Sequence, residues 1–407
     1  MIEVSKSNSI IKGDLKITGS KSESNRLLLL NQLFNQTLTL ENVSNSEDSK
    51  LMQKALANTS DLIDIHHAGT AMRFLTAYFA IQDGKSVVLT GSERMKQRPI
   101  GVLVDALNRL GADVNYIEND GYPPLKINGK KIQTSAITIP ANVSSQYITA
   151  LMLIGTQLEN GLTITLEGKI ISVPYIQMSI QLLNRIGVNA EMIGQEIKVD
   201  FTPSIAAKTV QVESDWSSAS YYYSLIALAE NSEISISTYY QDSLQGDSAL
   251  QEIYRDHFGV ISCFENGILT LKNDPDFIYK TVIELDLNNT PDIAQTIAAT
   301  CVGLNLKCKL TGLETLKIKE TDRLQALKNE LEKVGAIITI TNDTLSIDGY
   351  NAKSETPIFK TYNDHRMAMC MAPLAIKFPI IIEDEMVVEK SYPTFWEDWK
   401  QLGFIIE

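Results

Sequence analysis

A helix-like segment that ends in glycine recurs along the chain, and each copy runs directly into a strand-like stretch. An apolar residue and then a glycine close the copies, about 70 residues apart, at Gly111, Gly187, Gly259, Gly335 and Gly403. Glycine ends helices because it adopts left-handed dihedral angles without steric penalty. The spacing exceeds the periods of common solenoids. We therefore expect repeated α/β units, with a sixth copy near Leu51 to Leu56 that lacks its glycine.

The repeats indicate two α/β domains of about three units each, and a chain of 407 residues itself favours two or three domains. A strand-like stretch at Thr209–Val212 meets a helix signal at Trp216–Leu228, so we place a domain boundary near Val212–Ser214. The expected domains are residues 20–213 and a discontinuous domain of residues 1–19 with 214–407.

The formal net charge of -13 limits the class of partner. A nucleic-acid-binding surface is basic because it neutralises phosphates, so the bulk charge argues against nucleic acid. A small anionic substrate is still allowed, since a local cationic cleft can exist in an acidic protein. With 44% hydrophobic and 21% charged residues, the composition is that of a globular protein.

No segment suggests secretion or membrane insertion. Residues 1–12 lack the basic start and apolar stretch of a signal peptide, and no apolar run approaches the roughly 20 residues of a membrane-spanning helix. The cysteines form no CxxC pair, so reduced, mostly buried thiols are expected at Cys263, Cys301, Cys308 and Cys370. We therefore expect a cytoplasmic protein.

Positively charged side chains stand repeatedly where a helix is expected to begin. Ser20 and Glu23 have the spacing of a capping box, which places Lys21 and Ser22 at a helix N-terminus, with Arg26 about one turn further on. Further expected helix starts are Gly69–Arg73, Arg98–Pro99, Ser144–Gln146, Ser172–Tyr175, Thr290–Asp292, Lys319–Arg323, Asn363–Arg366 and the segment from Lys390 to Thr394.

First turns ordinarily favour Asp and Glu, because the helix N-terminus is the positive end of the helix dipole. Cations there are unfavourable without a counter-ion, and a multiply charged anion bound where several N-termini converge would supply one. Arginine offers bidentate forks for carboxylate and phosphate, and lysine is a point charge that can also move a proton. The pattern therefore indicates an anion-binding cleft.

Groups able to transfer protons lie among these cations, namely Lys21, Asp292, Glu320, Asp364 and His365. Each also has a structural interpretation. The carboxylates can complement the helix dipole, and a histidine is often packed or capping.

The sequence contains no P-loop, GxGxxG, HExxH or GxSxG motif. His66 and His67 are adjacent but lack partners at metal-ligand spacing, so no metal site is expected.

Taken together, these segments resemble the 5-enolpyruvylshikimate-3-phosphate synthase family over essentially the whole chain. The similar segments, in the family's order, are GSKSESNRLLLL (19–30), AGTAMRFLTA (68–77), RMKQRPIGVLVDAL (94–107), SSQYITALM (144–152), SVPYIQMSIQLL (172–183), DWSSASYYYSLIAL (215–228), TPDIAQTIA (290–298), KIKETDRL (317–324), YNDHRMAMCMAPLA (362–375) and KSYPTFW (390–396).

The resemblance implies an inside-out α/β barrel fold, with two similar domains of three βαβαββ repeats each and an active site in the interdomain cleft. It implies that the enolpyruvyl (1-carboxyvinyl) group of phosphoenolpyruvate moves to the 5-hydroxyl of shikimate 3-phosphate. Phosphate leaves by addition–elimination through a tetrahedral intermediate, with no cofactor and no metal. The implied partners are these two substrates of the shikimate pathway of aromatic amino-acid biosynthesis, not nucleic acid or membrane, and the expected state is a monomer.

The resemblance also implies residue roles, with Lys21, Asp292 and Glu320 catalytic. Binding of shikimate 3-phosphate is implied for Lys21, Ser22, Arg26, Ser144, Ser145, Gln146, Ser172, Tyr175, Asp292, Thr315 and Lys319. Binding of phosphoenolpyruvate is implied for Lys21, Gly69, Arg98, Gln146, Arg323, His365, Arg366 and Lys390. Gly69 would let the backbone approach that ligand.

Three positions depart from the family's common pattern. His67 and Phe74 stand where many members have asparagine and proline, which affects the local shape expected of the phosphoenolpyruvate pocket and the response to the inhibitor glyphosate. Thr315 stands where many members have an asparagine that contacts the sugar-like ring, and its hydroxyl has a shorter reach.

Two alternatives remain. The sibling enzyme that transfers enolpyruvyl to UDP-N-acetylglucosamine shares the fold and the donor. It typically carries a reactive loop cysteine in its first domain, whereas here no cysteine precedes Cys263. A non-catalytic repeat scaffold is compatible with the repeats, but it gives no role to the cations at the helix starts.

Overall fold

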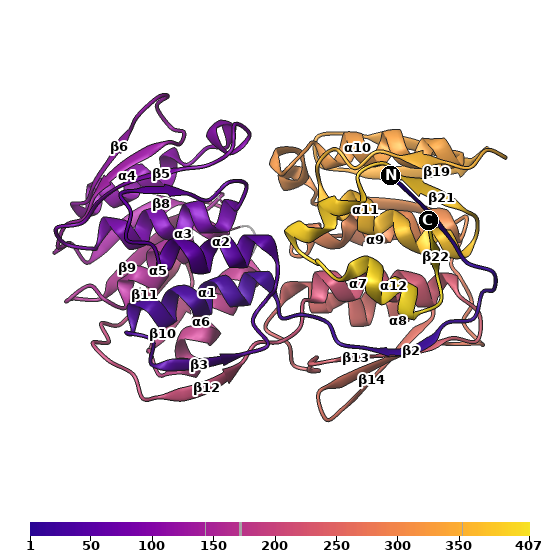
Figure 1. Ribbon diagram of the computed structural model, residues 1–407, viewed down its shortest axis with the longest axis horizontal. Coiled ribbons are helices and arrows are strands. Elements are labelled where there is room, and N and C mark those ends of the chain that lie inside the picture. The colour runs from indigo at the N-terminus through magenta and orange to yellow at the C-terminus, as the bar shows by residue number, and fades with distance from the viewer. Residues whose placement is uncertain (143, 171–172, 352) are drawn as a thin grey trace. The chain divides into compact units, whose positions relative to one another are not determined.

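The computed structural model describes residues 1–142, 144–170, 173–351 and 353–407, which form two compact units (Figure 1). The inserted unit is Gly19–Val212, and the terminal unit combines Met1–Thr18 with Glu213–Glu407. Each of the two boundaries between the units lies one residue before the expected boundary. That the two units are independent domains stays a prediction.

Two repeats of the inserted unit run strand, helix, strand, helix and then a pair of antiparallel strands. The first comprises β4 (Leu62–Asp64), α3 (Gly69–Ala80), β5 (Ser86–Thr90), α4 (Gly101–Leu110), β6 (Asp113–Tyr116) and β7 (Leu125–Asn128). The second comprises β8 (Ala136–Pro140), α5 (Ser145–Gly155), β9 (Leu162–Glu167), α6 (Val173–Ile186), β10 (Ala190–Ile193) and β11 (Glu196–Val199). The sheet orders β4-β5-β7-β6 and β8-β9-β11-β10 are equivalent, with the first pair parallel and the others antiparallel.

The third repeat of the inserted unit is shorter. It comprises β12 (Lys208–Gln211), α1 (Lys21–Leu33), β3 (Leu38–Glu41) and α2 (Glu47–Leu56), and its sheet is the parallel pair β12-β3. Helix α2 ends on Ala57 in a right-handed conformation, and the fully described segment from there to β4 contains no hairpin. This is the copy whose glycine is missing, so it has two of the four expected strands.

The terminal unit contains three repeats with four strands each, and two of them use strands from the N-terminal segment. The first comprises β2 (Lys12–Leu15), α7 (Trp216–Leu228), β13 (Glu233–Ser237), α8 (Leu250–Phe258), β14 (Val260–Glu265) and β15 (Ile268–Asn273). The second comprises β16 (Val282–Asp286), α9 (Ala294–Gly303), β17 (Lys307–Thr311), α10 (Arg323–Leu331), β18 (Ala336–Ile340) and β19 (Leu345–Tyr350). The third comprises β20 (Ile358–Phe359), α11 (His365–Met371), β21 (Ile380–Ile382), α12 (Phe395–Gln401), β22 (Ile405–Ile406) and β1 (Ile2–Ser5).

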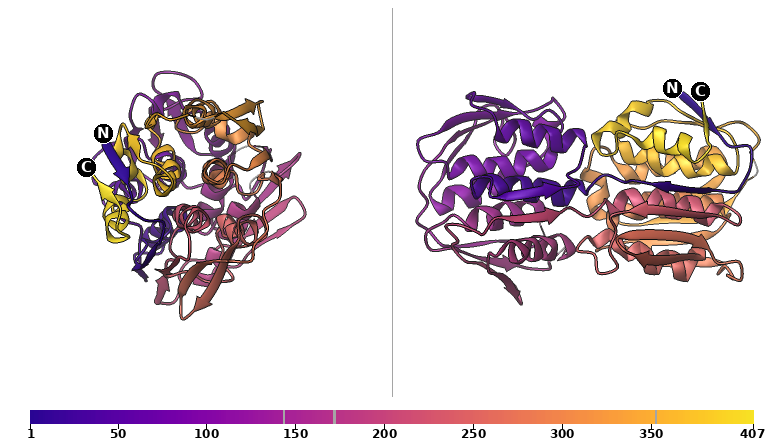
Figure 2. Two further views of the ribbon diagram at one scale, coloured as in Figure 1. Left: turned by 90° about the vertical axis from the view of Figure 1, so that its right-hand side faces the viewer. Right: turned by 60° about the horizontal axis from the view of Figure 1, so that its bottom comes forward.

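The sheets of the terminal unit follow one order, β2-β13-β15-β14, β16-β17-β19-β18 and β20-β21-β1-β22. Strand β2 therefore begins one repeat before the chain enters the inserted unit, and β1 completes another at the opposite end of the sequence. The two termini consequently lie side by side, as Figures 1 and 2 show, and Glu3 exchanges backbone hydrogen bonds with Glu407.

The predicted glycine caps are confirmed. The φ angles are 108° at Gly111, 97° at Gly187, 63° at Gly259, 94° at Gly335 and 84° at Gly403. These angles are left-handed, a region that other residues enter at a steric cost, so each helix reverses into its strand at the glycine.

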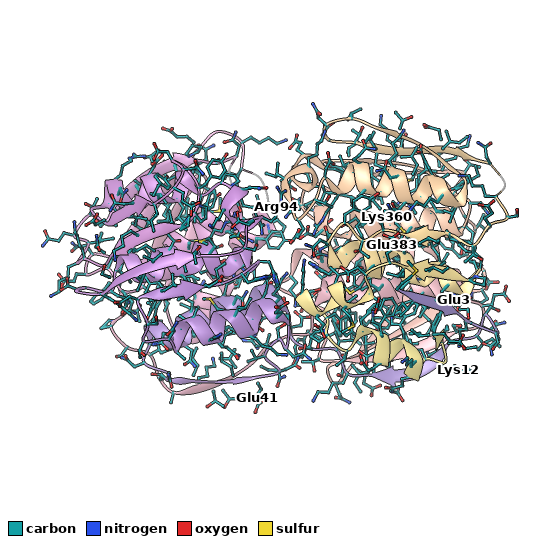
Figure 3. All side chains as sticks on the ribbon, turned by 45° about the horizontal axis from the view of Figure 1, so that its top comes forward. Glu3, Lys12, Glu41, Arg94, Lys360 and Glu383 are labelled. Carbon is teal, nitrogen blue, oxygen red and sulfur yellow. The ribbon has the colours of Figure 1, made fainter. Side chains whose placement is uncertain are left out.

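Each unit has helices inside and sheets outside. In the terminal unit α9 contacts both α7 and α11, the 3₁₀ helix Ala372–Ile376 after α11 contacts α7, and Figure 2 shows the sheets around them. In the inserted unit α1, α3 and α5 contact one another, and every residue of α3 is buried. A helix that is apolar on all sides requires such burial. Charged side chains such as Glu3, Lys12 and Lys360 are exposed on the outer surface (Figure 3).

All four cysteines are free, with Cys301, Cys308 and Cys370 buried and Cys263 exposed, so the prediction of reduced, mostly buried thiols is confirmed. Among the helices of the described ranges, none has the length and apolar character needed to cross a membrane.

Candidate active site

The predicted residues of the inserted unit gather at the N-terminal ends of its helices. Ser20 caps α1 by accepting a hydrogen bond from the Glu23 amide at 3.4 Å, and Ser144 caps α5 by accepting one from the Gln146 amide at 3.3 Å. The Gln146 side chain donates to Thr70 Oγ1 at 3.2 Å, which joins the first turns of α5 and α3.

The remaining residues of this group follow the same placement. Lys21 and Ser22 begin α1, Ser145 begins α5, and Tyr175 lies in the first turn of α6. Ser172 lies outside the described residues.

Arg98 lies over the start of α3, and none of the described residues neutralises its charge. A β-carbon at Gly69 would lie 2.6 and 2.9 Å from the two terminal nitrogens of Arg98 and 3.0 Å from Nη1 of Arg73. Arg73 donates to the backbone oxygens of Gly69 and Pro99, whereas Arg98 has no side-chain hydrogen bond or ion pair with any described residue. Two guanidinium groups at a helix N-terminus form a site for a carboxylate or a phosphate.

Arg98 was expected to open a helix, but α4 begins three residues later at Gly101. Arg98 thus extends from the preceding segment toward α3. The close approach of this guanidinium favours glycine at position 69, since a side chain would occupy the same space.

Arg26 is a buried anchor of the inserted unit, with an exposure of 3%. Its guanidinium donates to Ser179 Oγ at 2.8 Å, to the Ser22 carbonyl at 2.7 Å, and to Thr149 Oγ1 and the Tyr175 carbonyl, both at 3.4 Å. These partners belong to α1, α5 and α6. Arg26 therefore ties together the helix starts that hold the other predicted residues.

The environment of Arg26 is apolar as well as hydrogen-bonded. Burial lowers the pKa of Arg26 to about 10. The guanidinium lies 5.7 Å from the centroid of the Phe74 ring, which is fully buried. Phe74, a departure from the family's common residue, thus packs in the core beneath Arg26.

Lys21 has a carboxylate partner that the helix-start pattern does not reveal. Its Nζ lies 3.8 Å from Oδ2 of Asp48 in α2, and His67 Nε2 lies 3.2 Å from Oδ1 of the same carboxylate. His67 Nε2 also lies 3.5 Å from Glu47 Oε2, and His67 Nδ1 lies 2.8 Å from His66 Nδ1. The two histidines lack partners at metal-ligand spacing in the sequence, but in the fold α2 brings two carboxylates close to them.

Glu47, His66 and His67 offer ligand atoms that all lie within 4.8 Å of one another, a donor set that could hold a metal ion. Glu47 and His67 are partly exposed and His66 is exposed.

Several predicted residues of the terminal unit form one ion-pair network around Arg323, which is 2% exposed. Arg323 donates through Nε to Asp364 at 2.7 Å, through Nη1 to Asp292 at 2.9 Å and through Nη2 to Glu320 at 2.9 Å. Arg323 is the first residue of α10, and Asp364 is the N-cap of α11. The counter-ions of this helix-start arginine are thus carboxylates of the chain itself.

Asp292 is surrounded by cations. It accepts from Arg323, lies 3.6 Å from Lys319 Nζ, and receives Arg366 Nη2 at 3.4 Å. Burial alone would raise the pKa of Asp292, but Lys319, Arg366 and Arg323 outweigh burial and hold that pKa well below its usual range. Asp292 is therefore an ionised hydrogen-bond acceptor and a poor proton store.

Arg366 connects Asp292 to residues that the sequence analysis did not single out. Its Nη1 donates to the Asp292 carbonyl at 3.0 Å, and its Nη2 donates to Ser217 Oγ at 3.1 Å. Ser217 in turn donates to Asp247. No local motif could have identified Ser217 and Asp247, because they meet Arg366 only in the folded unit.

The other predicted residues of the terminal unit lie on the same elements or next to them. Thr315 lies in the 3₁₀ helix Glu314–Ile318, and its buried hydroxyl has no hydrogen-bond partner among the described residues. Lys390 donates to the Asn363 side chain at 2.6 Å, immediately before the start of α11. His365, the first residue of α11, is buried, with an exposure of 3%.

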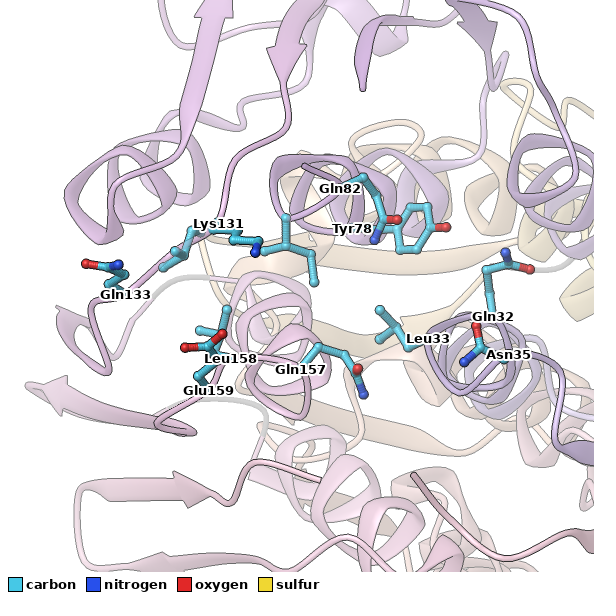
Figure 4. A pocket seen from close by; sticks show the side chains of 12 residues that line it. Gln32, Leu33, Asn35, Tyr78, Gln82, Lys131, Gln133, Gln157, Leu158 and Glu159 are labelled. Carbon is cyan, nitrogen blue, oxygen red and sulfur yellow. The ribbon is translucent and has the colours of Figure 1, made fainter. Parts of the chain in front are cut away.

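The opposite ends of the inner helices have a different character. A pocket of 430 Å³ lies where α1, α3 and α5 end, and uncharged amides such as Gln32, Gln82 and Gln157 line it beside Lys131 and Glu159 (Figure 4). Within the inserted unit, the cations Lys21, Arg73 and Arg98 are thus found at the helix starts.

Comparisons with known proteins agree with this architecture. A sequence model of the EPSP synthase (3-phosphoshikimate 1-carboxyvinyltransferase) family matches residues 53–399. The 3-phosphoshikimate 1-carboxyvinyltransferase of Bacteroides fragilis is 44% identical over 401 residues, which cover 98% of this chain and 97% of the relative. That of Colwellia psychrerythraea is 33% identical over 422 residues and covers 97% of both chains.

Solved structures show the same fold. The EPSP synthase of Acinetobacter baumannii superposes with a TM-score of 0.78 at 20% identity, over 100% of this chain and 99% of that one. The enolpyruvyl transferase NikO of Streptomyces tendae superposes with a TM-score of 0.73 at 14% identity, over 100% and 98%. Because the family model matches most of the chain and the Bacteroides fragilis relative is 44% identical to it, the chain belongs to the EPSP synthase family, the 3-phosphoshikimate 1-carboxyvinyltransferases.

Proposed function

We propose that this chain transfers the 1-carboxyvinyl group of phosphoenolpyruvate to the 5-hydroxyl of shikimate 3-phosphate. One observation carries the assignment of its donor site: Arg98 has no counter-ion among the residues that the structure describes, and it lies with Arg73 over the start of α3. Phosphoenolpyruvate bears a carboxylate and a phosphate, and either group would neutralise this pair of guanidinium groups.

The reaction needs three proton transfers and no redox change. The substrate hydroxyl loses its proton as its oxygen attacks the enol carbon, and the methylene gains a proton to become a methyl group. The tetrahedral intermediate then loses a methyl proton while the bond to phosphate breaks. Cations beside the reacting centre stabilise the charge that builds up, and positioned side chains carry the protons.

Lys21 and Glu320 are the proposed acid–base pair, and Asp292 is the proposed partner of the reacting hydroxyl. The depressed pKa of Asp292, held down by its three cations against burial, suits a group that accepts a hydrogen bond and orients the hydroxyl. Glu320 is only partly buried, and its Oε2 accepts a hydrogen bond from Arg323. The proposal requires that residues of both units reach one pair of ligands.

The acceptor and the donor then have two sets of residues, which share Lys21 and Gln146. We assign shikimate 3-phosphate to Lys21, Ser22, Ser144, Ser145, Gln146, Ser172, Tyr175, Asp292, Thr315 and Lys319, with Arg26 acting from beneath. We assign phosphoenolpyruvate to Lys21, Gly69, Arg98, Gln146, Arg323, His365, Arg366 and Lys390. Thr315 supports the first assignment, since its buried hydroxyl has no partner among the described residues.

The test is phosphate release from the wild type, Lys21→Ala and Glu320→Gln, with Glu314→Gln as a matched control on an exposed carboxylate nearby. We expect release that requires both substrates, survives in the control and is lost in the other two variants. No release from folded wild type would refute the proposal, and turnover of UDP-N-acetylglucosamine would then identify the sibling activity.

We further propose that the enzyme acts as a monomer in the cytoplasm. One chain supplies every residue assigned above, and its four cysteines are free. Light scattering on the purified protein should give the mass of one chain, and a dimer mass that persists on dilution would contradict the monomer.

A further inference from the structure

Asp247 is a buried carboxylate that the proposed reaction does not use. It lies in the 3₁₀ helix Gly246–Ala249 that precedes α8, and its exposure is 5%. Its Oδ2 accepts a hydrogen bond from Ser217 Oγ at 2.5 Å, whereas its Oδ1 has no hydrogen-bond partner among the described residues. Burying an incompletely paired carboxylate is costly, so its position calls for a physical reason.

The hydrogen bonds around Ser217 have a fixed direction. A serine hydroxyl has one proton, and here that proton faces Asp247. The oxygen lone pairs of Ser217 are therefore left for Arg366, whose Nη2 donates at 3.1 Å. Asp247, Ser217 and Arg366 thus form a chain in which each group accepts from the next.

The other side of Arg366 is held by Asp292. The Nη1 of Arg366 donates to the Asp292 carbonyl at 3.0 Å, and Nη2 lies 3.4 Å from the Asp292 carboxylate. A planar guanidinium held at two edges has a fixed orientation, which a single contact would not give. Without Asp247, the Ser217 hydroxyl could rotate, and its proton could turn toward the guanidinium.

We propose that Asp247 is a positioning residue that acts through Ser217 to orient the Arg366 guanidinium for the anionic donor substrate. This inference rests on the proposed role of Arg366 in binding phosphoenolpyruvate. The relay predicts a selective effect, because Arg366 is assigned to the donor and not to the acceptor. A carboxylate that served only to stabilise the fold would change the yield or the melting temperature and leave both KM values unaltered.

The charges around Asp247 agree with a group held against Arg366. Burial, and after it the charge of the nearby Asp292, raise the pKa of Asp247 to about 6, although Arg366 opposes both. Asp215 is a third carboxylate whose charge acts on Asp247. The relay depends on an oxygen of the Asp247 side chain that accepts a hydrogen bond. The experiment must therefore compare a variant that lacks this oxygen with one that retains it.

The experiment compares steady-state phosphate release by Asp247→Ala, Ser217→Ala, the double variant and the conservative Asp247→Asn. We expect Asp247→Ala to raise the KM for phosphoenolpyruvate about tenfold and to change the KM for shikimate 3-phosphate less than twofold. Asp247→Asn keeps an oxygen that can accept from Ser217, so its KM for phosphoenolpyruvate should return to within about threefold of the wild-type value.

The double variant and a control separate a relay from general damage. If Asp247 acts only through Ser217, the double variant should have the same KM for phosphoenolpyruvate as Ser217→Ala. The control is Asp242→Ala, which removes an exposed carboxylate in the segment before the same 3₁₀ helix and should behave as wild type.

Two results would overturn the inference: an unchanged KM for phosphoenolpyruvate in Asp247→Ala, or multiplying effects in the double variant. If Asp247→Ala does not fold, the KM for phosphoenolpyruvate is compared between Ser217→Ala and the double variant of Ser217→Ala with Asp247→Asn. The relay again predicts that these two values are equal. Wild-type release in the presence of both substrates is measured first, so failure of the proposed function is seen separately from failure of the relay.

Discussion

Replacing Gly69 by alanine tests the anion site at the start of α3 with a single methyl group. The added carbon would lie 2.6 Å from Nη1 and 2.9 Å from Nη2 of Arg98, well inside van der Waals contact. The atoms that it meets are the ends of flexible side chains, so the guanidinium can move away. We therefore expect the fold to tolerate Gly69→Ala and the donor site to be damaged.

The size of the effect follows from the contact that is lost. Arg98 must retreat by about 1 Å to restore normal contact, which breaks or weakens a charge-assisted hydrogen bond worth about 1.5–3 kcal/mol. At 1.4 kcal/mol per factor of ten, the KM for phosphoenolpyruvate should rise between about tenfold and about a hundredfold. Steady-state phosphate release gives this KM, and urea unfolding checks that stability changes by less than about 1 kcal/mol.

Gly101→Ala is the matched control, since Gly101 also begins a helix, α4. A β-carbon added there would lie no closer than 3.4 Å to another atom, the Cα of Gly121. This substitution should leave the KM unchanged. Arg98→Ala with and without Gly69→Ala provides a second check, because the methyl group has nothing to displace once Arg98 is gone. A wild-type KM for Gly69→Ala, or a full effect of the methyl group in the absence of Arg98, would refute the argument.

Three further predictions concern stability. Arg26→Lys should lower the free energy of unfolding by about 3 kcal/mol in urea, since an ammonium group cannot replace the fork of hydrogen bonds; a loss below 1 kcal/mol would contradict the anchor role. Because the pKa of Asp292 is depressed in the folded protein, its ionised carboxylate stabilises the fold above about pH 4, and this contribution is lost as the pH falls toward the folded pKa. Asp292→Asn should therefore show a smaller loss of unfolding free energy than the wild type in this acid range. Parallel pH profiles of the two proteins would contradict this prediction. Gly335→Ala should cost about 3 kcal/mol or more, because its β-carbon would lie 1.9 Å from the Asn351 carbonyl oxygen, whereas Gly111→Ala, with open space around it, should cost about 1 kcal/mol; equal melting temperatures would show that close contact is irrelevant.

Local chemistry explains why much of the fold could be predicted. A left-handed glycine acts on its own helix end, so Gly403 and its equivalents marked their turns without reference to the rest of the chain. The same reasoning marked the copy near Leu56 as atypical, and that copy lacks its hairpin. Serine caps are equally local, and Ser20 and Ser144 cap the helices expected of them.

The partners of the site residues could not be predicted, because they are distant in sequence. The helix-start pattern places Arg26 among the cations but gives no sign that it is buried against Thr149 and Ser179, which are 123 and 153 residues away. Carboxylates such as Asp48 likewise carry no local signal of the cation that they meet. Cations at helix starts are visible in the sequence, whereas the carboxylates that compensate them come from distant segments.

The way in which β1 completes the last sheet affects the order in which a ribosome can produce a finished fold. Ile2 pairs with Ile382, and Val4 pairs with Ile406, so β1 cannot pair until β21 and β22, which follow it by more than 370 residues, have been made. The strands of the inserted unit all lie within Gly19–Val212, and that unit can form while the remainder is being synthesised. During this interval β1 and β2 are edge strands without partners, and closing the terminal unit is a late event with long-range contacts.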